Sequence, residues 1–182
     1  MGTSSSKDGS GDGGALGARV GDVVEAGGRL DWTMETKDGP LTLSDMLAAG
    51  KCVVVFFYPK DETYGCTMEA CAFRDRYEAF CKLGAEVVGV SNDKDHTAFA
   101  KNHRLTYPLA SDVGGQVRRQ WGLTQFDVLG GLIKGRATYV IAPSGRIEQV
   151  FNSAIDFEGH MKESLGTVER IMAQSQGETV EA

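Results

Sequence analysis

Two cysteines, placed where a buried strand gives way to a helix, are the residues of this chain best suited to redox chemistry. Cys66 lies seven residues after Pro59 and five before Cys71, in the stretch FFYPKDETYGCTMEACAFRD. Unpaired N–H groups and the positive end of the helix dipole favour a thiolate at the start of a helix. Because the thiolate is the nucleophilic form of cysteine, Cys66 is a candidate nucleophile.

A helix over residues 66–83 would turn the two cysteines to different sides. At 3.6 residues per turn, an apolar stripe faces the sheet and consists of Cys66, Ala70, Phe73, Tyr77 and Phe80. Polar side chains share the face of Cys71, namely Arg74, Asp75, Glu78 and Lys82. We therefore expect Cys66 to point towards the interior and Cys71 towards solvent.

The loop that enters this helix carries three residues that suit a reactive site. The hydroxyl of Thr63 could hydrogen-bond the sulfur or an oxygen bound there, and Gly65 lets the backbone bend closely around the site. Pro59 stiffens the exit from the strand and shields one side. We expect these residues to form a tight, partly apolar socket for Cys66.

Simpler interpretations exist for each cysteine. Without the surrounding pattern, Cys66 would be a small packing residue at a strand–helix junction, and Cys71 an ordinary surface thiol. Cys52 opens a buried strand and is expected in the core. Cys81 would lie about 22 Å along the helix from Cys66, which makes it a poor redox partner.

Length and composition favour one ordinary domain without a nucleic-acid or membrane partner. The chain has 182 residues, 41% of them hydrophobic, which is enough for a sizeable core. It carries 19 basic against 25 acidic residues and no Lys/Arg block for a phosphate backbone or an anionic membrane. No apolar run reaches the roughly eighteen residues of a membrane span.

We expect a folded domain over residues 19–174 between two tails. Residues 1–18 form a Gly/Ser-rich segment predicted to be disordered, and residues 175–182 are expected to fray. The start of the chain has no apolar h-region of a secretory signal. We expect a cytoplasmic location, or a plastid or nucleus if a targeting segment has been removed.

Other motifs carry no chemistry. The formal GxGxxG fingerprint at residues 9–14 has no strand before it and no helix after it, so we reject a dinucleotide site. The four cysteines contain no Cys-x-x-Cys and no zinc spacing. The three histidines, His96, His103 and His160, are scattered, and for His96 and His103, seven residues apart, a surface location is favoured over a metal pair. We expect no metal or cofactor.

Apolar runs that alternate with helix-like stretches predict an α/β domain with a mixed central sheet. Residues 52–58 are apolar at every position and should form a central strand. The other expected elements, in chain order, are short strands or a hairpin at 22–32, helices at 43–49 and 66–83, a strand at 86–91, a helix at 95–103, a strand at 107–110, a helix at 115–121, a hairpin at 138–142 and 146–151, and a helix at 157–173.

The pattern Pro59-x-x-x-Thr63-x-x-Cys66 resembles the active-site signature of the peroxiredoxins. The surrounding stretch is similar to the peroxiredoxin Q, or bacterioferritin-comigratory-protein, class, and the resemblance extends over residues 20–173. It includes GLIKGRATYVIAPSGRI, where Arg136 occupies the family's arginine position. The resemblance implies a thioredoxin-like fold and the reduction of hydroperoxides.

The same resemblance implies roles for the individual residues. The Cys66 thiolate would attack the peroxide and become a sulfenic acid, with Thr63 and Arg136 as donors to the reacting oxygens. The five-residue spacing marks Cys71 as a resolving cysteine in the same chain, recycled by a thioredoxin-type protein. No second chain is then needed, and we expect a monomer without metal, flavin or haem.

The chain departs from the class at two positions. Tyr64 stands where proline is frequent, and Met68 where lysine is common. Neither position holds an essential group. The two changes bear on the rigidity and charge of the loop, and through them on rate or substrate range rather than on the reaction.

Two other functions remain open at this point. A disulfide oxidoreductase on the same fold would require a Cys-x-x-Cys motif, whereas four residues separate Cys66 from Cys71. A redox sensor that passes oxidation to a partner uses the same reactive thiol.

Five residues of helix separate the Cα atoms of Cys66 and Cys71 by roughly 8.7 Å, beyond the approximately 7 Å that a disulfide tolerates. Resolution by Cys71 therefore requires the first turn or two of the helix to unwind.

Overall fold

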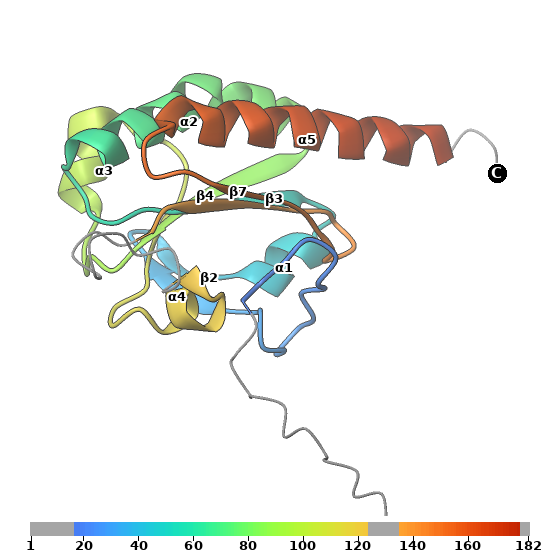
Figure 1. Ribbon diagram of the computed structural model, residues 1–182, viewed down its shortest axis with the longest axis horizontal. Helices are drawn as coiled ribbons and strands as arrows, with labels where there is room; N and C mark the ends of the chain where they lie inside the picture. The colour runs from blue at the N-terminus through green and yellow to red at the C-terminus, as the bar shows by residue number, and fades with distance from the viewer. Residues whose placement is uncertain (1–16, 124–134, 179–182) are drawn as a thin grey trace, which may run out of the picture.

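A seven-stranded mixed sheet with helices on both faces forms the frame of the molecule (Figure 1). The computed structural model describes residues 17–123 and 135–178. Nearly all of the predicted N-terminal tail, the rejected fingerprint at 9–14 and the last four residues of the predicted C-terminal tail lie outside the described residues.

The strand order is β2-β1-β5-β4-β3-β6-β7. In chain order the strands are β1 Thr33–Thr36, β2 Gly39–Thr42, β3 Cys52–Phe57, β4 Ala85–Ser91, β5 Leu109–Ser111, β6 Ala137–Ile141 and β7 Ile147–Asn152. The three central strands β5, β4 and β3 are parallel, and the pairs on either side of them are antiparallel. The predicted mixed α/β sheet is confirmed.

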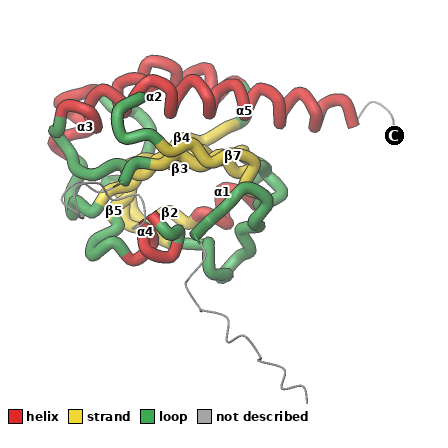
Figure 2. Tube along the Cα trace, in the orientation of Figure 1, coloured by secondary structure: helices red, strands yellow, loops and turns green. Residues whose placement is uncertain are grey.

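The helices divide between the two faces of this sheet (Figures 1 and 2). Helices α2 (Tyr64–Lys82), α3 (Thr97–His103) and α5 (Phe157–Glu178) cover one face. Helices α1 (Leu43–Ala48) and α4 (Gln116–Gln120) cover the other. Each face has its own hydrophobic core, so the sheet is buried on both sides.

Strand β3 is buried at every position, as its composition predicts. Because successive side chains point to opposite faces, Val53, Val55 and Phe57 enter the core under α1 and α4. Val54 and Phe56 enter the core under α2 and α5. The strand ends at the loop that leads to α2, so it fixes the position of that helix start.

The expected strands or hairpin at residues 22–32 are wrong. That segment forms turns with one isolated bridge, Val23 to Arg146, and the hairpin follows it as β1 and β2. The physical reason is Asp31, whose carboxylate accepts hydrogen bonds from the backbone N–H groups of Gly27 at 2.9 Å and Ser44 at 3.0 Å. These bonds replace the ladder that a strand would need.

The other elements occur where they are predicted, with shifted ends. Helix α2 begins at Tyr64 rather than Cys66, and α5 continues to Glu178, beyond the predicted end at Ala173. Neither these nor any other helix within the described ranges is long and apolar enough to cross a bilayer.

The turn between β6 and β7 provides a stability test. Gly145 has φ +85°, and an added Cβ would lie 2.5 Å from the backbone oxygen of Val24. Gly50 has a similar φ of +77° with open space around it. We predict that Gly145→Ala lowers the free energy of unfolding by at least about 1 kcal/mol more than Gly50→Ala, because only Gly145 adds a backbone clash to the φ penalty. Urea denaturation of both variants measures the difference, and equal losses would contradict the close approach.

Candidate active site

Cys66 is the third residue of α2 and is 2% exposed. The backbone N–H of Thr67 donates to the carbonyl of Thr63 at 2.9 Å. The N–H groups of Tyr64, Gly65 and Cys66 come before it and have no carbonyl one turn back in the helix. Cys66 thus lies in the positive field of a helix start, facing the interior as the apolar stripe predicts.

The guanidinium of Arg136 lies against this sulfur. Its Nη2 donates to Cys66 Sγ at 3.3 Å, and both side chains are buried. The sheet brings them together because Phe57 at the end of β3 pairs with Ala137 at the start of β6. Burial disfavours the charge of Arg136, but Glu69 and Cys66 outweigh it and raise its pKa, so the side chain stays cationic.

Thr63 and Pro59 lie in the loop before α2. The Thr63 side chain is exposed, and its hydroxyl donates to the carbonyl of Lys60 at 3.0 Å. The expected hydrogen bond from Thr63 to the sulfur is therefore not present in this structure. Pro59 is half-buried where the chain leaves the β3 core.

Helix α3 holds the same loop through two carboxylate–histidine pairs. Asp61 contacts His96 Nδ1 at 2.8 Å, and Glu62 contacts His103 Nε2 at 2.8 Å. Glu62 also accepts a hydrogen bond from Asn102, which helps to hold its backbone at a φ of 60°. The prediction that His96 is a surface residue is wrong, because its side chain is 4% exposed. The pairs fix the entry to α2.

Glu69 is a site residue that the sequence reasoning missed. It is fully buried and forms an ion pair with Arg136 Nη1. Burial raises the pKa of Glu69 to about 7, even though Arg136 acts in the opposite direction. The sequence does carry a signal for this burial, because Glu69 lies three residues after Cys66 and therefore on the same side of the helix as the apolar stripe. Arg74, on the polar face of the same helix, forms an ion pair with Asp75.

His160 of α5 lies next to Glu69 and is also fully buried. Its Nε2 lies 2.9 Å from the carbonyl of Ser153, and its Nδ1 lies 2.8 Å from the Thr138 hydroxyl. Nδ1 is also 3.4 Å from a carboxylate oxygen of Glu69. Burial lowers the pKa of His160 to about 4, so the ring is neutral at pH 7.

Phe157 covers the site from the start of α5. A Cβ at Gly65 would lie 2.6 Å from the ring of Phe157, so only glycine permits this packing. The guanidinium carbon of Arg136 lies 5.0 Å from the centre of the same ring, a cation–π distance. Phe157 thus packs against both Gly65 and Arg136. No sequence pattern identified it.

Cys71 is half-buried, and Arg74 Nη1 lies 3.5 Å from its sulfur. It lines a pocket of about 430 Å³ together with Met68, Ile155 and Phe157. Met68 and Ile155 are well exposed at this pocket, whose lining also includes the acidic residues Asp75, Asp156 and Glu158. Cys66 and Cys71 are free thiols on one continuous helix, so the structure corresponds to the reduced form.

The remaining cysteines lie as expected. Cys52 is fully buried at the start of β3, and burial raises its pKa to about 12, so it stays a thiol. Cys81 is exposed near the far end of α2. Neither contacts the site around Cys66.

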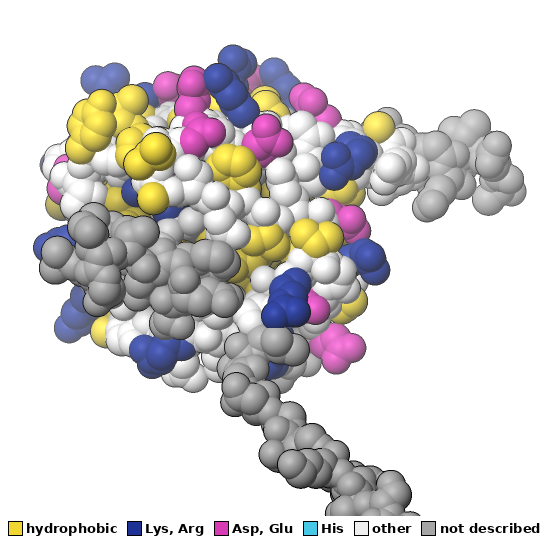
Figure 3. Space-filling model, in the orientation of Figure 1, with side chains coloured by type: hydrophobic (Ala, Val, Ile, Leu, Met, Phe, Trp, Pro, Cys, Tyr) yellow, Lys and Arg dark blue, Asp and Glu magenta, His cyan; other side chains and the backbone are white. Residues whose placement is uncertain are grey.

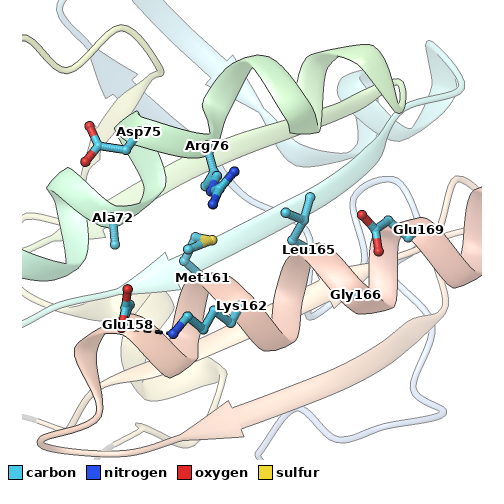
Figure 4. A pocket seen from close by; sticks show the side chains of 9 residues that line it. All are labelled: Ala72, Asp75, Arg76, Glu158, Met161, Lys162, Leu165, Gly166 and Glu169. Carbon is cyan, nitrogen blue, oxygen red and sulfur yellow. Dashed lines mark hydrogen bonds and ion pairs between the residues drawn. The ribbon is translucent and has the colours of Figure 1, made fainter.

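A larger groove, of about 520 Å³, runs between α2 and α5 (Figure 4). Its lining includes Arg76, Leu165 and Glu169 but neither Cys66 nor Arg136. Figure 3 shows Lys and Arg side chains interspersed with Asp and Glu side chains along the upper edge of the molecule, where α2 and α5 run in Figure 1. The groove is therefore separate from the candidate site at the start of α2.

Residues 29–150 match the family model described as the AhpC/TSA family. The chain belongs to the AhpC/TSA family. It is 47% identical over 137 residues to a chloroplastic peroxiredoxin Q of Gentiana triflora, a match that spans 74% of this chain and 61% of that protein. A relative of the same name from Sedum lineare is 47% identical, with 74% and 72% covered.

Solved structures of this family share the fold. A peroxidoxin BcpB from Mycobacterium tuberculosis is 36% identical with a TM-score of 0.72, covering 84% of this chain and 97% of that one. A PrxQ mutant from Xylella fastidiosa is 28% identical with a TM-score of 0.74, covering 84% and 96%. The predicted thioredoxin-like fold and the resemblance to the peroxiredoxin Q class are confirmed.

The packing of Phe157 on Gly65 leads to a reactivity prediction. Gly65→Ala should displace the Phe157 ring and with it Arg136, and should slow alkylation of Cys66 by iodoacetamide several-fold, because the thiolate loses its donor. The double variant Gly65→Ala with Phe157→Leu should recover part of the rate, since the smaller side chain leaves room for the methyl group.

Gly166→Ala is the matched control, because this exposed glycine of α5 has open space around it. Alkylation of Cys66 should be unchanged in this variant. An unchanged rate in Gly65→Ala as well would contradict the role of this packing.

The buried Glu69 and His160 predict a pH effect on stability. His160 has a folded pKa of about 4, below its ordinary 6.5, so its contribution is present above pH 6.5 and lost as the pH falls towards 4. Glu69 has a folded pKa of about 7, above its ordinary 4.5, so its contribution is present below pH 4.5 and lost as the pH rises through 7. The two effects oppose each other over the same range.

Glu69→Gln removes one of these opposing effects. We predict that the variant loses more free energy of unfolding than the wild type when the pH falls from 6.5 to 4, because only the His160 effect is left. Urea denaturation at both pH values measures this, with the exposed Glu163→Gln on α5 as the control. Parallel curves for wild type and Glu69→Gln would contradict the assigned protonation states.

Proposed function

We propose that this protein is a thiol-dependent peroxidase that reduces hydrogen peroxide and organic hydroperoxides through Cys66. The observation that supports this best is the contact of Arg136 Nη2 with the buried Cys66 sulfur at a helix start. The Arg136 guanidinium and the positive end of α2 thus both face the Cys66 sulfur. This arrangement stabilises a thiolate and a developing oxyanion.

The reaction follows from these groups. The thiolate of Cys66 attacks the terminal peroxide oxygen, an S–O bond forms and the O–O bond breaks. Cys66 becomes a sulfenic acid, and the leaving oxygen takes up a proton to give water or an alcohol. Negative charge moves from sulfur to the leaving oxygen, where Arg136 and the free N–H groups of the first turn can receive it.

The relatives support a peroxide substrate. One solved structure with 28% identity concerns the alkyl peroxide reduction activity of the Xanthomonas campestris bacterioferritin comigratory protein, with a TM-score of 0.69. We extend this substrate class to the present chain as a proposal. Met68, Ile155 and Phe157 give the pocket beside Cys71 an apolar part that is suited to the organic portion of such a substrate.

In the second step we propose that Cys71 attacks the sulfenic acid, releases water and forms a disulfide with Cys66. The intact helix holds the two sulfurs on different sides, so its first turns must open. A thioredoxin-type dithiol protein would then reduce the disulfide. Because both cysteines belong to one chain, we propose a monomer as the working unit.

Thr63 and Pro59 complete the proposed site. The Thr63 hydroxyl would turn from the Lys60 carbonyl to a bound peroxide oxygen, which requires rotation about a single side-chain bond. Pro59 restricts the backbone conformations of the loop that carries Thr63. For location we propose a plastid rather than the cytoplasm, supported by the chloroplastic relatives.

Substitution of the two cysteines tests the proposed sequence of steps. Cys66→Ser should abolish peroxide consumption, because the nucleophile is lost. Cys71→Ser should keep a rapid first turnover and lose cycling driven by thioredoxin and its reductase. Stopped-flow and coupled assays measure the two phases, and mass spectrometry of the peroxide-treated wild type should find Cys66 linked to Cys71.

The same assays separate the alternatives. Cys81→Ser is the matched control, because this exposed thiol lies on the same helix, and it should change neither phase. Sustained turnover by Cys71→Ser would remove Cys71 from its role. Insulin reduction without peroxide loss would favour a disulfide oxidoreductase, and oxidation limited to one turnover in the wild type would favour a redox sensor.

A further inference from the structure

Two acidic groups share one guanidinium in the interior of this protein. Arg136 directs Nη2 to Cys66 Sγ and Nη1 to Glu69 Oε2. The sulfur is 2% exposed, the carboxylate 0% and the arginine 6%. Burial makes unbalanced charge costly, and one cation balances one anion. A thiolate at Cys66 and a carboxylate at Glu69 therefore compete for Arg136.

The other charged and titratable groups around Glu69 do not remove this competition. Arg118 on α4 favours an ionised Glu69, but its Nη atoms donate to the carbonyls of Gly135 and Tyr58. Tyr107 is buried and stays neutral, since burial and Glu69 raise its pKa well above the ordinary value. The remaining neighbour is His160, whose protonation is fixed by its partners.

His160 offers Glu69 a lone pair rather than a proton. The carbonyl of Ser153 can only accept, so Nε2 of His160 carries the ring proton. Nδ1 of the neutral ring is then an acceptor, and the Thr138 hydroxyl donates to it. Glu69 Oε1 lies 3.4 Å from this nitrogen and has no hydrogen-bond partner among the described residues. A proton on Oε1 would give this oxygen a hydrogen bond to Nδ1, in competition with the Thr138 hydroxyl for the same lone pair.

From this arrangement we propose that Glu69 and His160 form a proton-binding site coupled to Cys66, occupied when Cys66 is a thiolate and empty when Cys66 is a thiol. In the exchange one proton leaves Cys66 Sγ and one binds Glu69 Oε1, where it is directed at His160 Nδ1. The total charge of the buried group does not change. The proposal goes beyond the peroxidase function, and only its consequence for catalysis rests on that function.

The pKa values of Glu69 and His160 are shifted in the directions that this proton-binding site requires. Burial moves the pKa of Glu69 up to about 7 and that of His160 down to about 4, so near pH 7 Glu69 can gain or lose a proton while His160 stays neutral. Groups that exchange a proton in this way titrate as a pair in two macroscopic steps. Between the steps the thiolate fraction is independent of pH, which would keep Cys66 reactive over a wide range.

The test is a thiolate titration of Cys66 followed by ultraviolet absorbance, in a background where Cys71 and Cys81 are serine. Wild type should show two steps. Glu69→Gln keeps an acceptor for Arg136 and a donor for His160 but cannot ionise, so it should show one step, displaced to lower pH by about one unit. A Glu69→Gln curve that overlies the wild type, or moves to higher pH, would overturn the proposal.

Two further measurements test the proposal without relying on correct folding of the Glu69→Gln variant or on peroxidase activity. Thr138→Val frees His160 Nδ1 for Glu69 alone and should also lower the midpoint, whereas an unchanged or raised midpoint counts against the site. Infrared difference spectra of wild type should gain a protonated carboxyl band as Cys66 ionises. A thiolate form without that band would show that Glu69 binds no proton, whatever the peroxide assays give.

Discussion

The contact between the Arg136 guanidinium and the Cys66 sulfur is the interaction on which the rest of the site depends. Both groups are buried, and each comes from a different part of the chain, one from the start of α2 and one from the start of β6. The antiparallel pairing of β3 with β6 is what brings them together. The mixed sheet therefore matters to function because it delivers a cation to a helix start.

The surroundings of Arg136 set how strongly it acts on the sulfur. Phe157 packs against it, Glu69 forms an ion pair with it, and His160 contacts Glu69 in turn. Glu69 also lies between the two cysteines on α2. Opening the helix for a disulfide would therefore loosen the pair with Arg136, so the proposed resolving step would also alter the charge balance of the site.

Much of this arrangement can be predicted from sequence because it is local. Burial of β3 follows from seven apolar residues in a row, and the inward face of α2 follows from the 3.6-residue period. Arg136 was identified by resemblance to a family, since no pattern within one chain relates residue 136 to residue 66. The turns at 22–32 were missed because their hydrogen bonds depend on a single side chain, Asp31.

The buried polar residues behind the site were harder to predict. A glutamate on the apolar stripe and a histidine on α5 each look like surface residues when considered alone. They are buried because they meet each other and Arg136 across three elements, which only the folded chain brings together. The role of Phe157 was equally hard to predict, since it depends on the absence of a side chain at Gly65.

The most direct measurement of the central claim is the thiolate fraction of Cys66 at pH 7 with and without the guanidinium. Arg136→Met in a Glu69→Gln background removes the cation without leaving a buried carboxylate unpaired. The account predicts that this double variant holds at least about tenfold less thiolate than Glu69→Gln alone, equivalent to about 1.4 kcal/mol. An equal thiolate fraction in the two proteins would show that Arg136 does not stabilise the sulfur.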